Sequence, residues 1–267
     1  MKPLKHSIPS HMVARPWQVV VVGAGGTGSA MLTSLARLHH AMLELGHPGG
    51  ILCTVFDDDT VSPTNIGRQS FYPSDIGAYK AAVLVNRINL LMGTDWKAQC
   101  TRLTASASIQ PDLIIGCVDT RAARKEILKA CRFARGYYLD CGNESDRGQV
   151  ILGQLGEKRA GKLPHVGELF PDLVDPSKDK ADLAPSCSMA DALRKQSLVI
   201  NQAIAVQAFN LLWTLYRTGT LQFCGSFINL ATGRTNPLPL DREAWARFGY
   251  QDQKARRKPK SESSTAT

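Results

Sequence analysis

QVVVVGAGGTGS, residues 18–29, joins a run of four valines to a cluster of glycines. A continuous apolar run with glycines behind it is typical of a buried parallel strand. Glycines in that position permit a tight turn and let backbone N–H groups approach a phosphate at the start of the next helix. Residues 29–45 follow with apolar side chains at helical spacing. We interpret the stretch as a nucleotide-binding strand–turn–helix unit; the alternative is a purely structural turn.

The alternation of strands and helices continues along the chain. Apolar runs predict further strands at residues 51–56, 98–103, 112–117, 137–141 and 149–155. Helical spacing predicts helices at residues 80–91 and 121–134 and, in two segments, over residues 188–218. Residues 223–230 and the turn after them are typical of an antiparallel edge. The order predicts an α/β, Rossmann-like fold with a mostly parallel sheet, helices on both faces and an antiparallel C-terminal extension.

Most of the 267 residues are expected to form one domain. We divide the chain into an N-terminal segment at 1–16, a domain at 17–250 and a tail at 251–267. Within the domain, residues 156–186 are polar and carry prolines, which favours a functional or mobile crossover loop. The tail holds KARRKPK, which supplies much of the formal charge of +9, and then SESSTAT. We expect it to be disordered, either as a solvated end or as a contact to nucleic acid.

Composition excludes several classes of protein. No stretch approaches the roughly 20 apolar residues of a membrane helix, and the N-terminus lacks the apolar centre of a signal peptide. We therefore expect a cytoplasmic protein that makes no membrane contact. The seven cysteines are scattered singly, which argues against a disulfide scaffold, and no CxxC pair offers a four-cysteine zinc site. No structural zinc is expected.

FDDDTVSPTNIGRQSF follows the second predicted strand with three adjacent carboxylates. An acid at that strand end can bind ribose hydroxyls, and Asp57 has that place, although its distance from the glycine cluster exceeds the ~20 residues of dinucleotide sites. The alternative for Asp57 is a turn residue. Arg68 and Lys80 follow as cations that can hold a triphosphate, and Asp119 as a carboxylate that can hold Mg²⁺. Because no histidine has a convincing catalytic setting, this set favours ATP over NAD.

Four ordered motifs make the pattern specific: GAGGTGS, DDDTVSPTNIGRQ, the first lysine of KAAVLVNRIN, and CVDTRAAR. Together they resemble the adenylating domain of the E1 superfamily, of the ThiF/MoeB/HesA type that activates ubiquitin-like and sulfur-carrier proteins. The usual family order is GxGGxGS, DxDxVxxSNLxRQ, lysine and DxxxxR, and here Thr64 replaces the serine. The resemblance covers roughly residues 19–155 and the helix after Cys187. The run PSCS…ALxxQ…N is most similar to the ThiF-like family of the bacterial PRTRC plasmid cassette.

The resemblance implies a function and a set of site residues. It implies a homodimeric adenylyltransferase that uses ATP and Mg²⁺ to activate the C-terminal carboxylate of a small ubiquitin-like, β-grasp partner. Cys187, Arg68 and Lys80 would be catalytic, and Asp119 would bind the metal with Arg124 beside it. The residues implied in nucleotide binding are Gly23, Gly25, Gly26, Gly28, Asp57, Asp59, Asn65, Arg68, Gln69, Lys80 and Asp119.

Cys187 lies in PSCS at the start of a predicted helix, where a helix N-terminus favours the thiolate. It resembles the cysteine that accepts the activated carboxyl as a thioester in E1 enzymes; the alternative is an incidental cysteine in a helix-capping segment. The chain departs from the family pattern in lacking the zinc cysteines, in an insertion over residues 38–50, and in lacking an arginine-bearing N-terminal helix. Arg15 is the nearest substitute for that arginine, and Asp58 receives no role.

Two other functions stay open at the level of the sequence. An ATP-binding regulatory module of a plasmid-maintenance system would use the nucleotide only to set its conformation, with the basic tail on DNA. An NAD(P)-linked oxidoreductase would use the glycine turn for a dinucleotide.

Overall fold

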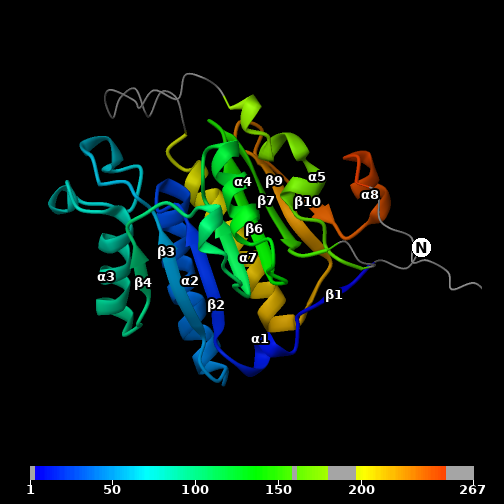
Figure 1. Cartoon of the computed structure of the whole chain (residues 1–267), viewed down its shortest axis with the longest axis horizontal. Helices are drawn as coiled ribbons and strands as arrows, with labels where there is room; N and C mark the ends of the chain where they lie inside the picture. The colour runs from blue at the N-terminus through cyan, green and yellow to red at the C-terminus, as the bar shows by residue number, and fades with distance from the viewer. Residues whose placement is uncertain (1–3, 158–160, 180–196, 251–267) are drawn as a thin grey trace, which may run out of the picture.

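The computed structural model describes residues 4–157, 161–179 and 197–250, so Cys187 and the basic tail lie outside the described residues. Within them, an eight-stranded mixed sheet has the order β10-β9-β7-β6-β5-β2-β3-β4 (Figure 1). A two-stranded sheet pairs β1 with β8. The strands are β1 His6–Ser7, β2 Trp17–Val22, β3 Ile51–Phe56, β4 Lys97–Gln99, β5 Leu113–Gly116, β6 Tyr137–Asn143, β7 Arg147–Gln154, β8 Thr220–Leu221, β9 Phe223–Asn229 and β10 Arg234–Pro239.

The sheet has a parallel part and an antiparallel part. Strands β6, β5, β2, β3 and β4 run parallel to one another, whereas β7, β9 and β10 extend the β6 edge in antiparallel pairs. The prediction of an α/β fold with an antiparallel C-terminal extension is therefore confirmed.

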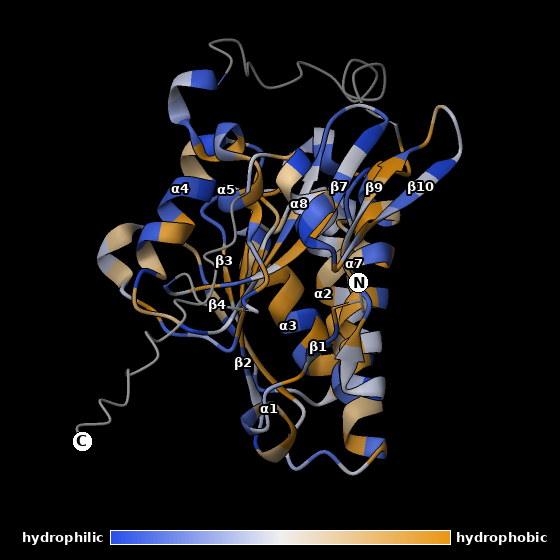
Figure 2. Cartoon of the chain, turned by 90° about the vertical axis from the view of Figure 1, so that its right-hand side faces the viewer, coloured by the Kyte–Doolittle hydropathy of each residue, from blue (hydrophilic) through white to orange (hydrophobic). Residues whose placement is uncertain are grey.

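Helices cover both faces of the sheet. The connections through α2 and α3 step toward the β4 edge, and the connection through α4 steps toward β6, so right-handed crossovers place them on opposite faces. Figure 2 shows α7 on one side of the sheet and α4 and α5 on the other. The helices are α1 His11–Ala14, α2 Gly26–Glu44, α3 Lys80–Met92, α4 Arg121–Ala130, α5 Val166–Leu169, α7 Ile200–Thr218 and α8 Arg242–Arg247. None of the helices in the described residues has the length and apolar composition that crossing a membrane requires.

Several predicted element boundaries were wrong. The helix expected from residue 29 begins at Gly26, inside the glycine cluster, and the helix expected to reach residue 134 ends at Ala130. The strand expected over 98–103 is only Lys97–Gln99, because β4 is a short edge strand and Leu103 reaches the core from irregular backbone. The predicted helix over 188–218 is described only from its second part, where α7 begins at Ile200.

Part of the predicted crossover loop contains regular structure. Residues 161–179 include the short helix α5 and two 3₁₀ turns, Pro171–Val174 and Pro176–Lys178. Leu163 and Leu169 are buried, and Lys162 Nζ donates to Glu168 at 3.0 Å and to the Gly156 carbonyl at 2.8 Å. This stretch therefore packs against the domain rather than extending from it.

The N-terminal residues also pack against the domain, at the end of the sheet where the strands begin. Arg15 forms two hydrogen bonds with Asp112, at 2.7 and 2.8 Å, just before β5. The backbone N–H of Gln18 donates to the same carboxylate. Since Asp112 precedes β5, Arg15 lies at the opposite end of the sheet from the glycine turn.

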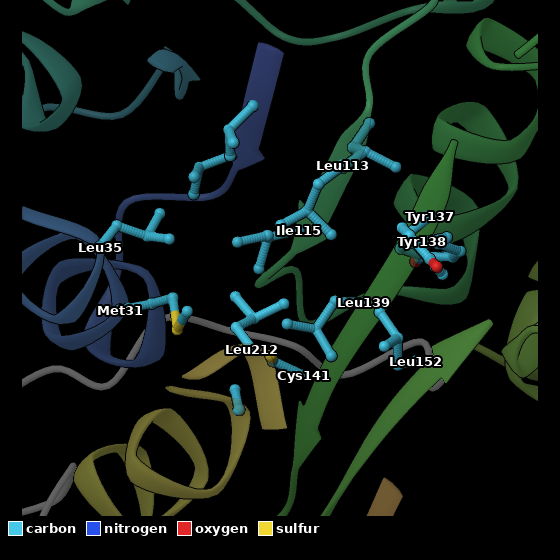
Figure 3. Packing of buried hydrophobic residues seen from close by; sticks show 14 of the residues in the cluster. Met31, Leu35, Leu113, Ile115, Tyr137, Tyr138, Leu139, Cys141, Leu152 and Leu212 are labelled. Carbon is cyan, nitrogen blue, oxygen red and sulfur yellow. The ribbon is translucent and has the colours of Figure 1, made fainter. Parts of the chain in front are cut away.

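The core lies between the sheet and the paired helices α2 and α7. Strand β5 reads LIIG and is buried on both faces, as parallel strands between two helical layers require. Figure 3 shows side chains of α2 and α7 packing onto the central strands; those labelled include Met31, Leu35, Leu113, Ile115, Leu139 and Leu212.

We predict that Leu35→Ala lowers the free energy of unfolding by about 2–5 kcal/mol, because it removes a fully buried side chain and leaves a cavity. Leu90→Ala is the matched control: its side chain is 85% exposed on α3, so the change should stay within about 0.5 kcal/mol. Denaturant unfolding of both variants measures the difference. Equal effects would contradict the assignment of the α2 face to the core.

Candidate functional site

The strand order reverses between β2 and β5, since β3 follows on one side and β5 lies on the other. In open α/β sheets, ligands bind beyond the carboxyl ends of the strands at this reversal. The structure has a cavity of about 480 Å³ there. Its walls include the predicted residues Gly23, Gly25, Gly26, Asp57, Asp59, Arg68, Gln69, Lys80 and Asp119.

The glycine turn is shaped by close contacts of its backbone. Gly23 has a φ of +92°, and a Cβ there would lie 2.4 Å from the Cys117 carbonyl oxygen. A Cβ on Gly28 would lie 1.9 Å from the Gly23 carbonyl oxygen, so Gly28 supports the turn from behind and does not line the cavity. Helix α2 begins directly at Gly26, so its free N–H groups face the cavity, where an anion would be stabilised.

Asp57 connects the glycine turn to the end of β3. One carboxylate oxygen accepts from the backbone N–H of Ala24 at 2.6 Å, and the other accepts from the N–H of Asp59 at 2.9 Å. Burial raises the pKa of Asp57, and these two hydrogen bonds together with the charge of Lys80 oppose the increase. Asp57 is thus both a turn residue and a wall of the cavity, and its carboxylate oxygens keep lone pairs that can accept further hydrogen bonds.

Asp59 positions Lys80. Its carboxylate accepts from Lys80 Nζ at 2.8 Å, and its carbonyl accepts from the Lys80 backbone N–H at 3.0 Å. The lysine side chain is buried to 9% exposure, whereas the Asp59 side chain is 60% exposed. The ammonium group is therefore held at the start of α3 with its head in the cavity wall.

The loop after Asp59 brings three predicted residues to different places. Arg68 and Gln69 line the cavity, and the Gln69 amide nitrogen lies nearest to the position that a Cβ on Gly25 would take, 3.9 Å away. The Gln69 Oε1 atom is buried without a hydrogen-bond partner in the described residues. Asn65 does not line the cavity: its Oδ1 accepts from the backbone N–H and hydroxyl of Ser62 and so closes the 3₁₀ turn Pro63–Asn65.

Asp119 follows strand β5 and lines the same cavity as Asp59 and Lys80. Burial raises the pKa of the Asp119 carboxyl group, while the positive charges of Arg124 and Lys80 oppose the increase. No group of three or more His, Cys, Asp or Glu side chains in the described residues could hold a metal by itself. A nucleotide-bound Mg²⁺ needs only one or two protein carboxylates besides phosphate oxygens, and Asp119 fits that requirement.

Arg124 has a partner that the sequence analysis missed. Its Nε donates to Asp140 at 2.9 Å, and the Tyr138 hydroxyl donates to the same oxygen at 3.0 Å. Asp140 is fully buried in β6. Desolvation lowers the pKa of Arg124, but the negative charge of the Asp140 carboxylate outweighs this effect, so the pKa is raised. Arg124 thus forms a buried ion pair with Asp140, while its charge also acts on Asp119, beside which it was expected.

The family model of the ThiF family matches residues 13–243, which is most of the chain. This chain belongs to the ThiF family.

Curated relatives of this ThiF-family chain match part of it. The adenylyltransferase and sulfurtransferase UBA4 of Yarrowia lipolytica is 31% identical over 124 residues, which are 44% of this chain and 28% of that protein. The ubiquitin-like modifier-activating enzyme 5 of Arabidopsis thaliana is 26% identical over 168 residues, 54% of this chain and 36% of that protein. The chain spans about a third of the length of these relatives.

Solved structures share the fold. E. coli MccB with ATP is 16% identical with a TM-score of 0.57, over 85% of this chain and 64% of that chain. PaaA is 14% identical with a TM-score of 0.58, over 84% of this chain and 64% of that chain. At these identities the likeness concerns the ThiF-type fold alone.

Three further residues of this ThiF-family site were not assigned from the sequence. Asn201 in the first turn of α7 and Arg102 after β4 both line the cavity, and Arg102 binds Asp58 at 2.9 and 3.0 Å. Asp140 does not line the cavity but forms the ion pair with Arg124. An acid inside the apolar strand YYLDCGN was a usable signal for Asp140, and the last residue of the PSCS…ALxxQ…N run is Asn201, whereas Arg102 reaches the cavity only through tertiary structure.

We predict that Arg124→Met lowers the free energy of unfolding by about 3–5 kcal/mol, because it leaves the Asp140 carboxylate buried and unpaired. Adding Asp140→Asn should restore part of that loss by removing the charge. Arg147→Met is the matched control, since Arg147 is 65% exposed and should change stability little. Chemical denaturation of the wild type and the three variants tests this. An Arg124→Met variant with an unchanged free energy of unfolding would contradict the buried ion pair.

Proposed function

We propose that this protein uses ATP to adenylate the C-terminal carboxylate of a small ubiquitin-like or sulfur-carrier protein. The proposal rests on one observation above all: in a ThiF-family chain, acids and cations together line one cavity at the sheet reversal, and Asp59 holds Lys80 there in an ion pair. Asp57 stands at the end of β3, where ribose hydroxyls would be bound, and Lys80 with Arg68 stands where phosphates would be neutralised. The similarity to UBA4 and to ubiquitin-like modifier-activating enzyme 5 supports the same activity.

The proposed reaction transfers an adenylyl group. An oxygen of the partner's terminal carboxylate attacks the α-phosphorus of ATP, the bond from that phosphorus to the bridging oxygen breaks, and pyrophosphate leaves with the electron pair. An acyl adenylate remains. Lys80 and Arg68 would offset the negative charge that builds up on the phosphates, and the helix α2 N-terminus would add N–H donors. Mg²⁺, held in part by Asp119, would neutralise charge on phosphate oxygens.

We predict that pyrophosphate exchange into ATP requires both Mg²⁺ and a candidate β-grasp partner. Lys80→Met should reduce the exchange rate by about 10²–10³-fold, because one preorganised cation at the phosphates is lost. Lys97→Met is the matched control: Lys97 is an exposed residue of β4 outside the cavity, and its variant should exchange at the wild-type rate. Binding of ATP without exchange, across all candidate partners, would refute adenylation and favour the regulatory module.

We further propose that Cys187 accepts the activated acyl group and that the chain is of the PRTRC-cassette type, on the basis of the PSCS…ALxxQ…N run. The thiolate would attack the acyl carbon of the adenylate, and AMP would leave, so that a thioester forms. Cys187 lies outside the described residues, and its sequence context supports the proposal.

We predict that incubation with ATP, Mg²⁺ and the partner yields a covalent conjugate that thiols cleave. Cys187→Ala should abolish this conjugate but keep pyrophosphate exchange, because adenylation precedes the transfer. Cys100→Ala is the control variant. Non-reducing electrophoresis reads the outcome, and a conjugate that persists in Cys187→Ala would assign the transfer elsewhere.

A further inference from the structure

A second helix begins at the nucleotide cavity. Thr27, in the first turn of α2, donates from its hydroxyl to Asn201 Oδ1, in the first turn of α7, at 3.0 Å. Near the other end, the Tyr216 hydroxyl of α7 donates to the Met42 carbonyl of α2 at 3.4 Å. The two helices therefore run side by side in the same direction, and both N-termini are at the cavity.

This arrangement has an electrostatic consequence. Helix dipoles place partial positive charge at the N-terminus, so two parallel helices of 19 residues each bring like partial charges together. An anion between the two N-termini would be attracted by both. The cavity wall at this point is formed by Gly25, Gly26, Thr27 and Asn201.

Asn201 is directed at the same point. Its side chain is buried to 6% exposure, and its Oδ1 is used by Thr27. Its Nδ2 lies 2.3 Å from the position that a Cβ on Gly26 would take, so any other residue at position 26 would push the Asn201 amide out of this place. No acceptor for Nδ2 is found in the residues that the structure describes, although both Asn201 and Gly26 line the cavity. The amide thus presents an N–H donor with no partner at the start of both helices.

We propose that Asn201 is a phosphate ligand of the nucleotide, with Nδ2 donating to a phosphate oxygen above Gly26. This proposal rests on the proposed function only in placing a nucleotide triphosphate in the cavity. Asn201 would then bring α7 into the phosphate site, which the glycine turn and α2 otherwise form from the first quarter of the chain.

The start of α7 and the glycine turn are also in contact with the neighbouring β6–β7 hairpin. The backbone N–H of Ser197 donates to the Ser145 carbonyl in the β6–β7 turn at 2.7 Å. The Thr27 hydroxyl also contacts Asn143 Oδ1, at the end of β6, at 3.2 Å. A phosphate on Asn201 would therefore hold the glycine turn, the start of α7 and the β6–β7 turn in one arrangement.

The test is calorimetric titration of the full chain with ATP, ADP, AMP and adenosine in the absence of any partner protein. Asn201→Asp keeps the acceptor for Thr27 but replaces the donor by a negative charge. It should weaken ATP binding by roughly 10- to 100-fold, as loss of a hydrogen bond to a charged group would, and leave adenosine binding within about twofold. Asn143→Asp is the matched control, because Asn143 contacts Thr27 but does not line the cavity, and it should weaken ATP binding by less than about threefold.

Equal weakening of ATP and adenosine by Asn201→Asp, or no weakening at all, would overturn the proposal. If Asn201→Asp does not fold, Asn201→Ser supplies the same comparison, since it removes the Nδ2 donor without adding a negative charge. A wild-type protein that binds no ATP would overturn this proposal together with the proposed function. ATP binding that depends on Asn201, in a protein without pyrophosphate exchange, would refute adenylation alone.

Discussion

The Asp57 carboxylate is the contact on which the site depends. It holds the Ala24 N–H of the glycine turn with one oxygen and the Asp59 N–H with the other, and Asp59 in turn holds Lys80. The turn after β2, the loop after β3 and the start of α3 are thereby fixed relative to one another. Desolvation works against this carboxylate, and its pKa is raised. The backbone donors and the lysine limit that penalty, which is why the acid can serve the fold and the cavity at once.

The three adjacent acids do not share one environment. Asp57 bonds to the backbone, Asp58 binds Arg102 at the cavity rim, and Asp59 pairs with Lys80. Each negative charge has its own donor, so the repulsion that the sequence suggests is largely compensated without a bound metal. Lys80 and Arg102 are thus held in place by acids in the absence of a ligand, and the proposed adenylation would use Lys80 as a preorganised cation.

The sequence predicted features formed by contiguous residues and missed contacts between residues that are distant in the chain. Strand β2, the glycine turn and the motif around Asp57 are local patterns, so the fold class and most of the cavity wall were predictable. The pair Arg124–Asp140 joins a helix to a strand that lies elsewhere in the sequence, so the acid in YYLDCGN was visible but its partner was not, and Asn201 meets Thr27 only because α2 and α7 pack in parallel. The strand expected over 98–103 is only three residues long, Lys97–Gln99. Its length depends on pairing with one neighbour at the sheet edge, which the local sequence does not show.

The parallel packing of α2 and α7 gives the cavity two sources of positive potential that come from opposite ends of the chain. Such packing is electrostatically unfavourable in isolation, and an anion at the shared N-termini would compensate it. The proposed phosphate would therefore stabilise the packing of the two helices as well as the glycine turn. Because Ser197 is bonded to the β6–β7 turn, the added order extends to the antiparallel edge of the sheet. If a nucleotide binds there as proposed, occupancy of the cavity would be coupled to the position of the second half of the domain.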